Sequence, residues 1–443
     1  MNVVAEAPGG ACGLGHNRFM ARQLFIALLL LAASVGAARV AAGGVEDILK
    51  TAVALACAEE PPGPADMAAA LPGGAVVLAD EPLRMGEMSF GWRRRFGLAT
   101  GARVRLTRLA PRGALRRIEA EYAAPHGGAP RPEVIVIAGP DCRLRAARRL
   151  LYDADGRAEA IEMLDSALVP TGASEPLNPP APEGVDPGGV TVALVDSGVN
   201  YLLPEIAAGL ARDKNGKALG FDYWDLDDRP FDANPARSPF FPQRHGTRVA
   251  SVILREAPRV RLIPYRYPRP EPARWADLVA DAAAKGARVV NMAMGSNRAE
   301  DWGSFVAAAK AHPGLLFVVS AGNDGRDIDR RPVYPAAFDL DNMIVVTSAD
   351  ALGAPAPGSN WGKRTVDLLV PGERVPVTDF TGARTTASGA SFAAPRLTAL
   401  AARLAAANPA WRAAELKAAI IARARRTDAA DPTTRHGFLD PAR

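Results

Sequence analysis

The most informative segment of the chain is VTVALVDSG, residues 190–198. Its first part, Val190–Val195, is a nearly continuous apolar run with β-branched residues, as in a strand that is buried on both faces. Three similar runs follow at Val289–Met294, Leu315–Ser320 and Met343–Ser348. Helical patterns, such as Trp275–Lys285 and Phe305–Ala311, lie between them. Apolar strands that alternate with helices predict an α/β domain over residues 190–443, with a mainly parallel sheet and helices on both faces.

Polar motifs follow these strands, at the edge where parallel sheets form their sites. Asp196 ends the first strand, where a carboxylate could orient an imidazole. His245, in HGTRVA (245–250), opens a predicted helix and has small neighbours. Asn323, in SAGNDG (320–325), follows the third strand and could donate a hydrogen bond to an oxyanion. Taken singly, these residues could also be a turn-forming Asp, a surface His and an Asn in a left-handed turn.

The most specific motif is GASFAAP, residues 389–395. Ser391 lies at the start of an Ala/Leu-rich helix that we expect to run to about Ala407. A hydroxyl nucleophile at a helix N-terminus benefits from the positive end of the helix dipole when negative charge develops. Pro395 is tolerated in the first turn, because its missing N–H has no partner there. An isolated Ser at this place could equally be an N-cap.

In this order, DSG, HGT, AGN and GASFAAP resemble the motifs of the subtilase family of serine proteases, over roughly residues 188–443. The chain order Asp, His, Ser is the one found in subtilisin. Asn291–Gly295 is similar to the family strand that lines the substrate cleft. Three departures bear on cleft shape and specificity rather than on the triad: Arg248 stands in place of the usual His, Ala390 in place of Thr and Ala293 in place of Ser.

The resemblance implies a serine endopeptidase that acts through an acyl-enzyme. Ser391 would attack the scissile carbonyl, His245 would be the general base, and Asp196 would orient the imidazole. Asn323 and the Ser391 N–H would hold the oxyanion. A polypeptide substrate would lie between two strand ends, with an apolar or broad preference because these carry no acidic residue: Ala293, Met294, Gly295, Ser320, Ala321 and Gly322.

Three other functions stay open on the sequence alone. The same acyl-enzyme could serve a transpeptidase or macrocyclase, since cleft details choose the acyl acceptor. The domain could be an inactive scaffold, or the N-terminal region could be the main functional part as a binding module.

The N-terminus, residues 1–42, resembles a secretory signal peptide. Arg18 and Arg22 precede the apolar run Leu24–Ala33, which is too short to span a membrane comfortably. Met20 could be the true start, and an uncleaved membrane anchor is the alternative. We therefore expect an exported protein, periplasmic or extracellular.

The cysteines fit an oxidising compartment. Cys12 lies in or before the signal, which leaves Cys57 and Cys142 for one disulfide in the exported chain.

Residues 43–169 predict a small, mainly antiparallel β-rich domain. A short helix is expected at Val45–Cys57, and a hairpin turn at Asp153–Gly156. Residues 170–189 contain six prolines and predict an extended linker.

We expect the N-terminal domain to be a prosegment that inhibits the cleft and is cut off in the linker; the alternative is a permanent accessory domain. Because prolines hinder cleavage beside themselves, the expected cut sites are Gly172–Glu175 and Glu183–Val185.

The net charge of +5 and the sequence pI near 9.2 make the chain mildly basic. Its arginine clusters, such as Arg93–Arg95 and Arg148–Arg149, lack interleaved aromatic residues, so we expect solvated surface and no nucleic-acid partner. The family often binds structural calcium, but the acidic cluster lacks EF-hand spacing, and we expect a solvated loop and no required cofactor or metal. The cluster is Asp222, Asp225, Asp227, Asp228 and Asp232.

Overall fold

The computed structural model describes residues 44–350, 352–425 and 433–442. The expected signal peptide, residues 1–42, and Cys12 lie outside these residues. In the described part, no helix combines the length and apolar character that a membrane span needs.

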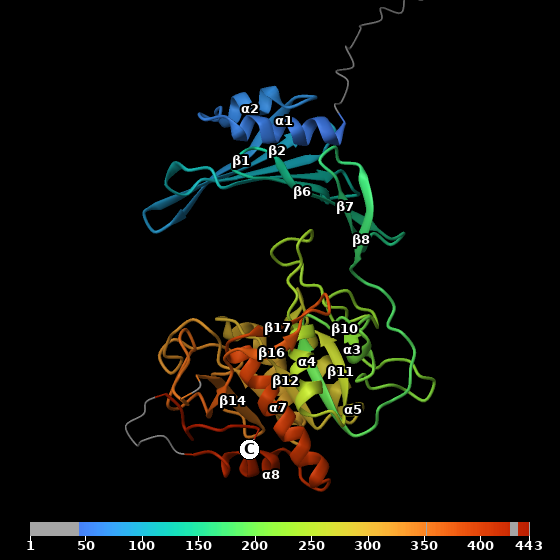
Figure 1. The fold of residues 1–443 in the computed structure, drawn as a ribbon, viewed down its shortest axis with the longest axis vertical. Coiled ribbons are helices and arrows are strands. Elements are labelled where there is room, and N and C mark those ends of the chain that lie inside the picture. Colours follow the sequence, from blue (N-terminus) through green and yellow to red (C-terminus); the bar gives the residue numbers. More distant parts are fainter. Residues whose placement is uncertain (1–43, 351, 426–432, 443) are drawn as a thin grey trace, which may run out of the picture. The chain divides into compact units, whose positions relative to one another are not determined.

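The N-terminal domain is an eight-stranded antiparallel sheet in which each strand pairs with the next one along the chain (Figure 1). Its strands are β1 (Ala75–Met85), β2 (Met88–Leu98), β3 (Arg103–Leu109), β4 (Arg117–Ala124), β5 (Arg131–Ala138), β6 (Leu144–Tyr152), β7 (Ala158–Leu164) and β8 (Pro170–Pro176). Helices α1 (Val45–Cys57) and α2 (Pro64–Ala70) pack on one face, where Leu49 and Met67 meet Phe96 and Ile118 in the core. The predicted antiparallel domain, its first helix and the turn between β6 and β7 are confirmed.

A disulfide joins Cys57, at the end of α1, to Cys142, in the turn between β5 and β6. Their Cα atoms lie 6.0 Å apart, and 85 residues separate them along the chain. The bond therefore ties the helical layer to the sheet.

Two expectations for this domain are wrong in part. Arg94 is not solvated surface: it is only 9% exposed, and its guanidinium binds Asp80 (3.0 Å) and the carbonyl of Pro62 (2.7 Å). The predicted linker begins with β8, which pairs with β7. Proline is tolerated at the ends of an edge strand, where no ladder hydrogen bond from its nitrogen is needed. Residues 170–176 therefore belong to the sheet.

Residues 177–189, here called the strap, have no regular secondary structure, but they are held in place. Hydrogen bonds join them to the C-terminal domain at Tyr201–Pro179 (2.5 Å), Arg212–Pro182 (2.7 Å) and Gly184–Gly216 (3.1 Å). Asp186 adds an ion pair with Arg261 at 2.8 Å. The strap is thus part of the surface of the C-terminal domain.

The C-terminal domain contains a seven-stranded sheet in which all strand pairs are parallel, with the order β10-β11-β9-β12-β13-β14-β15. The strands are β9 (Val190–Asp196), β10 (Phe221–Asp222), β11 (Val260–Arg266), β12 (Val289–Met292), β13 (Leu316–Ser320), β14 (Met343–Ala349) and β15 (Leu368–Pro371). A separate hairpin consists of β16 (Val375–Thr378) and β17 (Arg384–Ala387). The predicted parallel sheet is confirmed.

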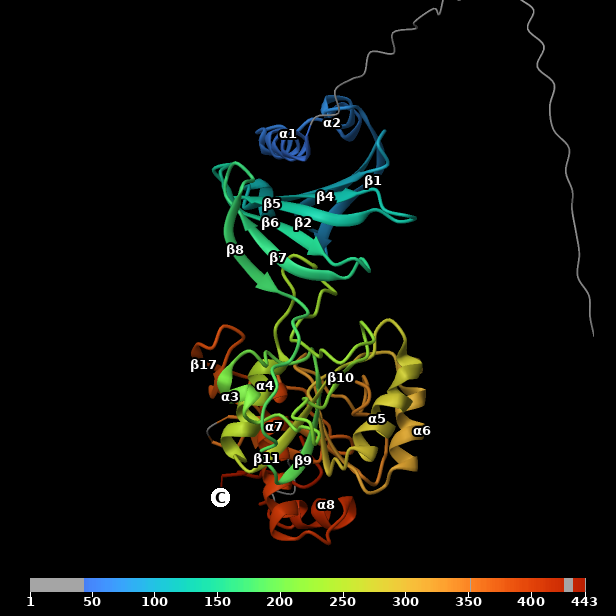
Figure 2. The same ribbon diagram turned by 90° about the vertical axis from the view of Figure 1, so that its right-hand side faces the viewer.

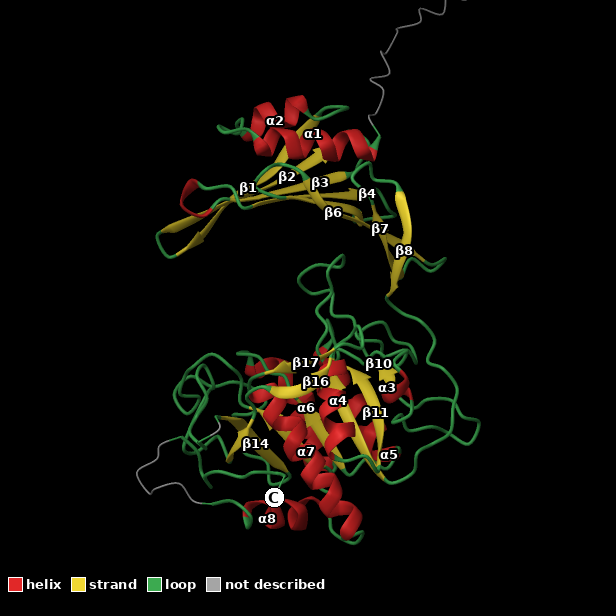
Figure 3. Ribbon diagram, viewed as in Figure 1, coloured by secondary structure: helices red, strands yellow, loops and turns green. Residues whose placement is uncertain are grey.

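Helices cover both faces of this sheet (Figures 2 and 3). They are α3 (Pro204–Ala207), α4 (Gly246–Glu256), α5 (Trp275–Ala284), α6 (Gly303–Ala311), α7 (Ala390–Ala407) and α8 (Ala413–Ile421). Side chains of β9 alternate between the two faces. Ala193 and Val195 pack in the core that α5 and α6 contribute to, whereas Val192 and Leu194 pack in the core that α4 and α7 contribute to.

Candidate active site

The candidate residues gather where β9, β12 and β13 end. Because these strands are parallel and adjacent, their carboxyl ends share one edge of the sheet. Asp196 is the last residue of β9. His245 is the N-cap of α4, and Ser391 is the second residue of α7, a helix that packs against α4. All three elements begin or end as the sequence predicts.

Asp196 and His245 are directly paired. Nδ1 of His245 lies 2.8 Å from Oδ1 and 2.9 Å from Oδ2 of Asp196. The carboxylate is 2% exposed, and it also accepts the N–H of Ser197 at 2.7 Å. Burial alone would lower the pKa of His245, but the charge and hydrogen bond of Asp196 outweigh it, so the pKa of His245 is raised. The pairing fixes the imidazole so that Nε2 is the nitrogen left for proton transfer.

A second buried carboxylate, Asp232, lies behind this pair. It is 0% exposed and accepts hydrogen bonds from Ser197 Oγ (2.6 Å), Thr247 Oγ1 (2.5 Å) and the N–H of Thr247 (2.9 Å). The N–H of His245 donates to the same carboxylate at 3.2 Å. Burial raises the pKa of Asp232, and the bonds from Ser197 and Thr247 offset part of that effect. Asp232 thereby joins the end of β9 to the start of α4.

The hydroxyl of Ser391 stands at the N-terminus of α7. Its Oγ donates to the carbonyl of Ala293 at 3.5 Å. Among the described residues, no hydrogen bond joins this hydroxyl to His245. The neighbouring Phe392 ring lies 5.9 Å from the His245 ring, centroid to centroid. Asp196 and His245 are therefore in direct contact. Ser391 lies near them because its helix, α7, packs against α4, and because its hydroxyl contacts Ala293, which lines the same cavity as His245.

Asn323 contacts the start of the same helix. Its Oδ1 accepts the N–H of Ala390 at 2.8 Å, so the remaining polar atom, Nδ2, is a donor. The close approach requires Gly389, whose φ is 120°, because a Cβ there would lie 2.8 Å from Oδ1 of Asn323. An amide donor thus lies beside the Ser391 backbone.

A cavity of about 500 Å³ opens beside His245. Asp196 lines it, and so does the segment after β12 that was expected to bind substrate, Ala293, Met294 and Gly295. Ser320, Ala321 and Gly322 are not among its lining residues, and Ser320 and Ala321 are buried (3% and 0% exposed).

The acidic cluster is not the solvated loop that we expected. Asp222 is 1% exposed and pairs with Arg266 at 2.7 Å, and Asp232 is buried as described above. Asp225 also pairs with Arg266, Asp228 pairs with Lys217, and Asp227 accepts from Asn178. In the described residues, no group of three or more acidic, His or Cys side chains is arranged to hold a metal ion. That no cofactor is required stays a prediction.

Sequence reasoning missed several residues around the site. Ser197 and Thr247 lie inside the recognised motifs, but nothing in the sequence indicates their shared partner. Arg248 was noted only as a departure, and Trp302, which lines the cavity, carries no motif.

Comparison with known proteins agrees with the geometry. The sequence profile described as the subtilase family matches residues 188–438. A thermophilic serine proteinase of Bacillus sp. (strain AK1) is 29% identical over 233 residues, which cover 49% of this chain and 52% of that protein. Alkaline serine exoprotease A of Vibrio alginolyticus is 29% identical over 251 residues, covering 54% and 42%. The chain thus spans about half the length of these relatives.

Solved structures include a cold-adapted subtilisin-like serine proteinase that is 24% identical. The match covers 60% of this chain and 94% of that one, with a TM-score of 0.48.

Proposed function

The chain belongs to the subtilase family, and we propose that it is a serine endopeptidase whose nucleophile is Ser391. The family match covers the segment that contains Asp196, His245 and Ser391. The chain matches only about half the length of these relatives, so experiments on the chain itself must identify its substrates and partners.

In the proposed reaction, the Ser391 hydroxyl forms a bond to the scissile carbonyl carbon while Nε2 of His245 takes its proton. Asp196 holds the opposite ring nitrogen and stabilises the imidazolium. The amide of Asn323 and the backbone N–H of Ser391 donate to the oxygen that becomes negative. The product of this attack is a tetrahedral intermediate. Its collapse breaks the peptide bond, and His245 gives the proton to the leaving amine. Water then hydrolyses the acyl-enzyme by the same route.

The observation that carries the proposal is the bond of 2.8 Å between His245 and a carboxylate that is almost fully buried. A histidine that is merely part of the surface would not require a buried carboxylate as a hydrogen-bond partner, so the pairing favours a role as a base. A base whose pKa is raised in this way is a better proton acceptor once it is neutral.

Labelling with a fluorophosphonate tests the proposal. The probe should modify wild-type protein at Ser391, as mapped by mass spectrometry, and Ser391→Ala should lose both labelling and peptide hydrolysis. Ser388→Ala, in the short segment just before α7, is the matched control and should keep both. Labelling elsewhere, or hydrolysis by folded Ser391→Ala, would remove the assignment. New free termini in the products distinguish hydrolysis from transpeptidation.

We also propose that the mature protein is exported. The disulfide between Cys57 and Cys142 supports this, because such bonds persist in oxidising compartments. The mature N-terminus, determined by mass spectrometry of protein from its own host, tests whether residues 1–42 are removed.

A further inference from the structure

The cavity beside His245 is lined by more arginines than acidic residues. Three arginines line it: Arg244, Arg248 and Arg269. Two aspartates also line it, Asp196 and Asp301.

Both aspartates are already paired. Asp196 binds His245, and Asp301 forms an ion pair with Arg298 at 3.3 Å. Glu271, on the loop after Arg269, pairs with Arg274 at 3.1 Å. None of these three acidic groups forms an ion pair with Arg248 or Arg269.

Arg244 is also committed. It pairs with Glu175, donates to the carbonyl of Asp232 and lies over the Phe380 ring, 3.9 Å from the centroid. In contrast, the guanidinium groups of Arg248 and Arg269 have no ion pair and no hydrogen-bond partner in the described part of the chain.

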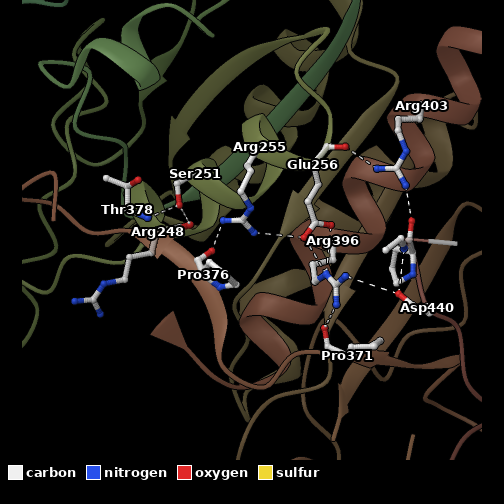
Figure 4. Close-up of polar contacts among 12 residues, drawn as sticks. Arg248, Ser251, Arg255, Glu256, Pro371, Pro376, Thr378, Arg396, Arg403 and Asp440 are labelled. Atoms are coloured by element: carbon white, nitrogen blue, oxygen red, sulfur yellow. Dashed lines mark hydrogen bonds and ion pairs between the residues drawn. The ribbon is translucent and has the colours of Figure 1, made fainter. Parts of the chain in front are cut away.

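Arg248 follows His245 by three residues, so the two lie on one side of α4 near its start. Figure 4 shows how it differs from the arginines deeper in α4 and α7. Arg255 and Arg396 pair with Glu256 at 3.4 and 3.0 Å, and Arg403 donates to the carbonyl of Glu256 at 2.7 Å. Arg248 projects away from this network. Its Nε has no hydrogen-bond partner among the described residues.

One further carboxylate, Asp379, stands near Arg248 on the hairpin of β16 and β17. Its Oδ1 accepts three bonds within its own turn, from Thr381 N, Thr381 Oγ1 and Ala383 N. It makes no hydrogen bond or ion pair with Arg248 among the described residues, although the two charges attract each other.

We propose that Arg248 and Arg269 make this cavity a subsite for an acidic side chain, Asp or Glu, of the polypeptide substrate. The inference rests on the proposed proteolytic function. A guanidinium presents paired N–H donors that match a carboxylate. The remaining wall includes Met294 and Trp302, which can cover the methylene groups of the bound side chain. A lysine or arginine of the substrate would instead meet two guanidinium groups that have no ion-pair partner among the described residues.

Matched peptides test the inference. A quenched fluorescent peptide that the purified full chain cleaves at one mapped bond is varied one position at a time, from four residues before the bond to three after it. Each position carries Glu, Gln or Lys. At one position, kcat/KM for Glu should exceed that for Gln by about tenfold at low ionic strength, and Lys should be poorer than Gln. Raising the salt concentration should reduce the preference.

Charge-removing variants locate the effect. Arg248→Gln should bring the Glu/Gln ratio close to one, and Arg269→Gln should reduce it by less, because Arg269 is exposed and more strongly screened. Arg259→Gln, an exposed arginine away from the cavity, should keep the ratio. Each ratio is taken within one preparation, so it does not depend on how much of a variant folds.

The outcomes separate the two ideas. Equal cleavage of the Glu and Gln peptides at every position, or a preference for Lys, would overturn the acidic subsite while proteolysis stands. A preference that persists in both Arg248→Gln and Arg269→Gln would overturn the residue assignment. If wild type cleaves no peptide at all, the proposed function falls and this inference falls with it.

Discussion

The hydroxyl of Ser197 donates a hydrogen bond of 2.6 Å to the carboxylate of Asp232, which lies 35 residues further along the chain. Ser197 follows Asp196 directly, and the N–H of His245 reaches the same carboxylate at 3.2 Å. Asp232 therefore positions both members of the pair without touching the reacting atoms.

Asp232→Asn should shift the pH profile of activity. The charge of Asp232 raises the pKa of His245, so its removal lowers that pKa. Because the base must be neutral, kcat/KM falls as the pH drops through this pKa, and the acid limb of the variant should move to lower pH. Lost hydrogen bonds should also cost about 1–3 kcal/mol of unfolding free energy. A pH–rate series with thermal melts measures both.

Asp228→Asn is the control, because it removes the same charge from an exposed pair with Lys217. Its acid limb should stay in place. An acid limb that stays in place in Asp232→Asn as well would reduce Asp232 to a purely structural residue.

Asn323→Ala should lower kcat by about 10²–10³ with little change in KM, the loss seen when one oxyanion donor is removed from subtilisin. Asn323→Asp is the sharper comparison. It keeps the acceptor for the N–H of Ala390 but has no amide donor, so it should preserve the start of α7 and still lose kcat. Steady-state kinetics decide. A rise in KM at constant kcat would indicate that Asn323 binds the ground state instead.

The denatured mature protein should contain no free thiol from Cys57 or Cys142. The double variant Cys57→Ser/Cys142→Ser should lose about 2–5 kcal/mol of stability in the N-terminal domain, because the bond closes a long loop. Thiol titration and melts measure the two effects. Two free thiols in exported protein would contradict the bond, and an unchanged melt would show that it adds little.

Wild type and Ser391→Ala should both keep the N-terminal domain after removal of the signal, so that their masses differ only by the oxygen atom that the substitution removes. Both expected cut sites are engaged: Gly172–Glu175 lies in β8, and Gly184 is hydrogen-bonded to Gly216. A protease needs an extended segment that is free to enter its cleft. In addition, no described residue of the N-terminal domain lines the cavity beside His245. We therefore expect a permanent accessory domain. Wild type that matures near residue 175, beside an uncut Ser391→Ala, would instead establish a prosegment.

The sequence predicts the parts of the site that depend on local pattern. Asp196 ends β9, and His245 and Ser391 start α4 and α7, because apolar runs and small residues mark these boundaries. It does not predict Asp232 as a partner of Ser197, because charge alone does not reveal burial and the partners are far apart in the chain. The same limit applies to Arg94, whose buried contacts with Asp80 and Pro62 form only in the folded sheet.

Strand β8 was missed for a different reason. Its prolines and glycine weaken the strand pattern, and only pairing with β7 makes the segment regular. Ser391 shows the converse: its place on α7 is predictable, but its hydroxyl contact with Ala293 is not, because that contact depends on side-chain rotation.

Because His245 N–H reaches Asp232 at 3.2 Å, the chain between them begins and ends at almost the same point. Residues 233–244 therefore form a loop whose two ends are held together by this hydrogen bond. The entropy of closing such a loop grows only with the logarithm of its length, about 0.6 kcal/mol for each doubling. Extra residues can therefore be inserted there at a small entropic cost while His245 stays bound to Asp232, which makes this segment a suitable point of attachment for new recognition elements next to an unchanged chemical centre.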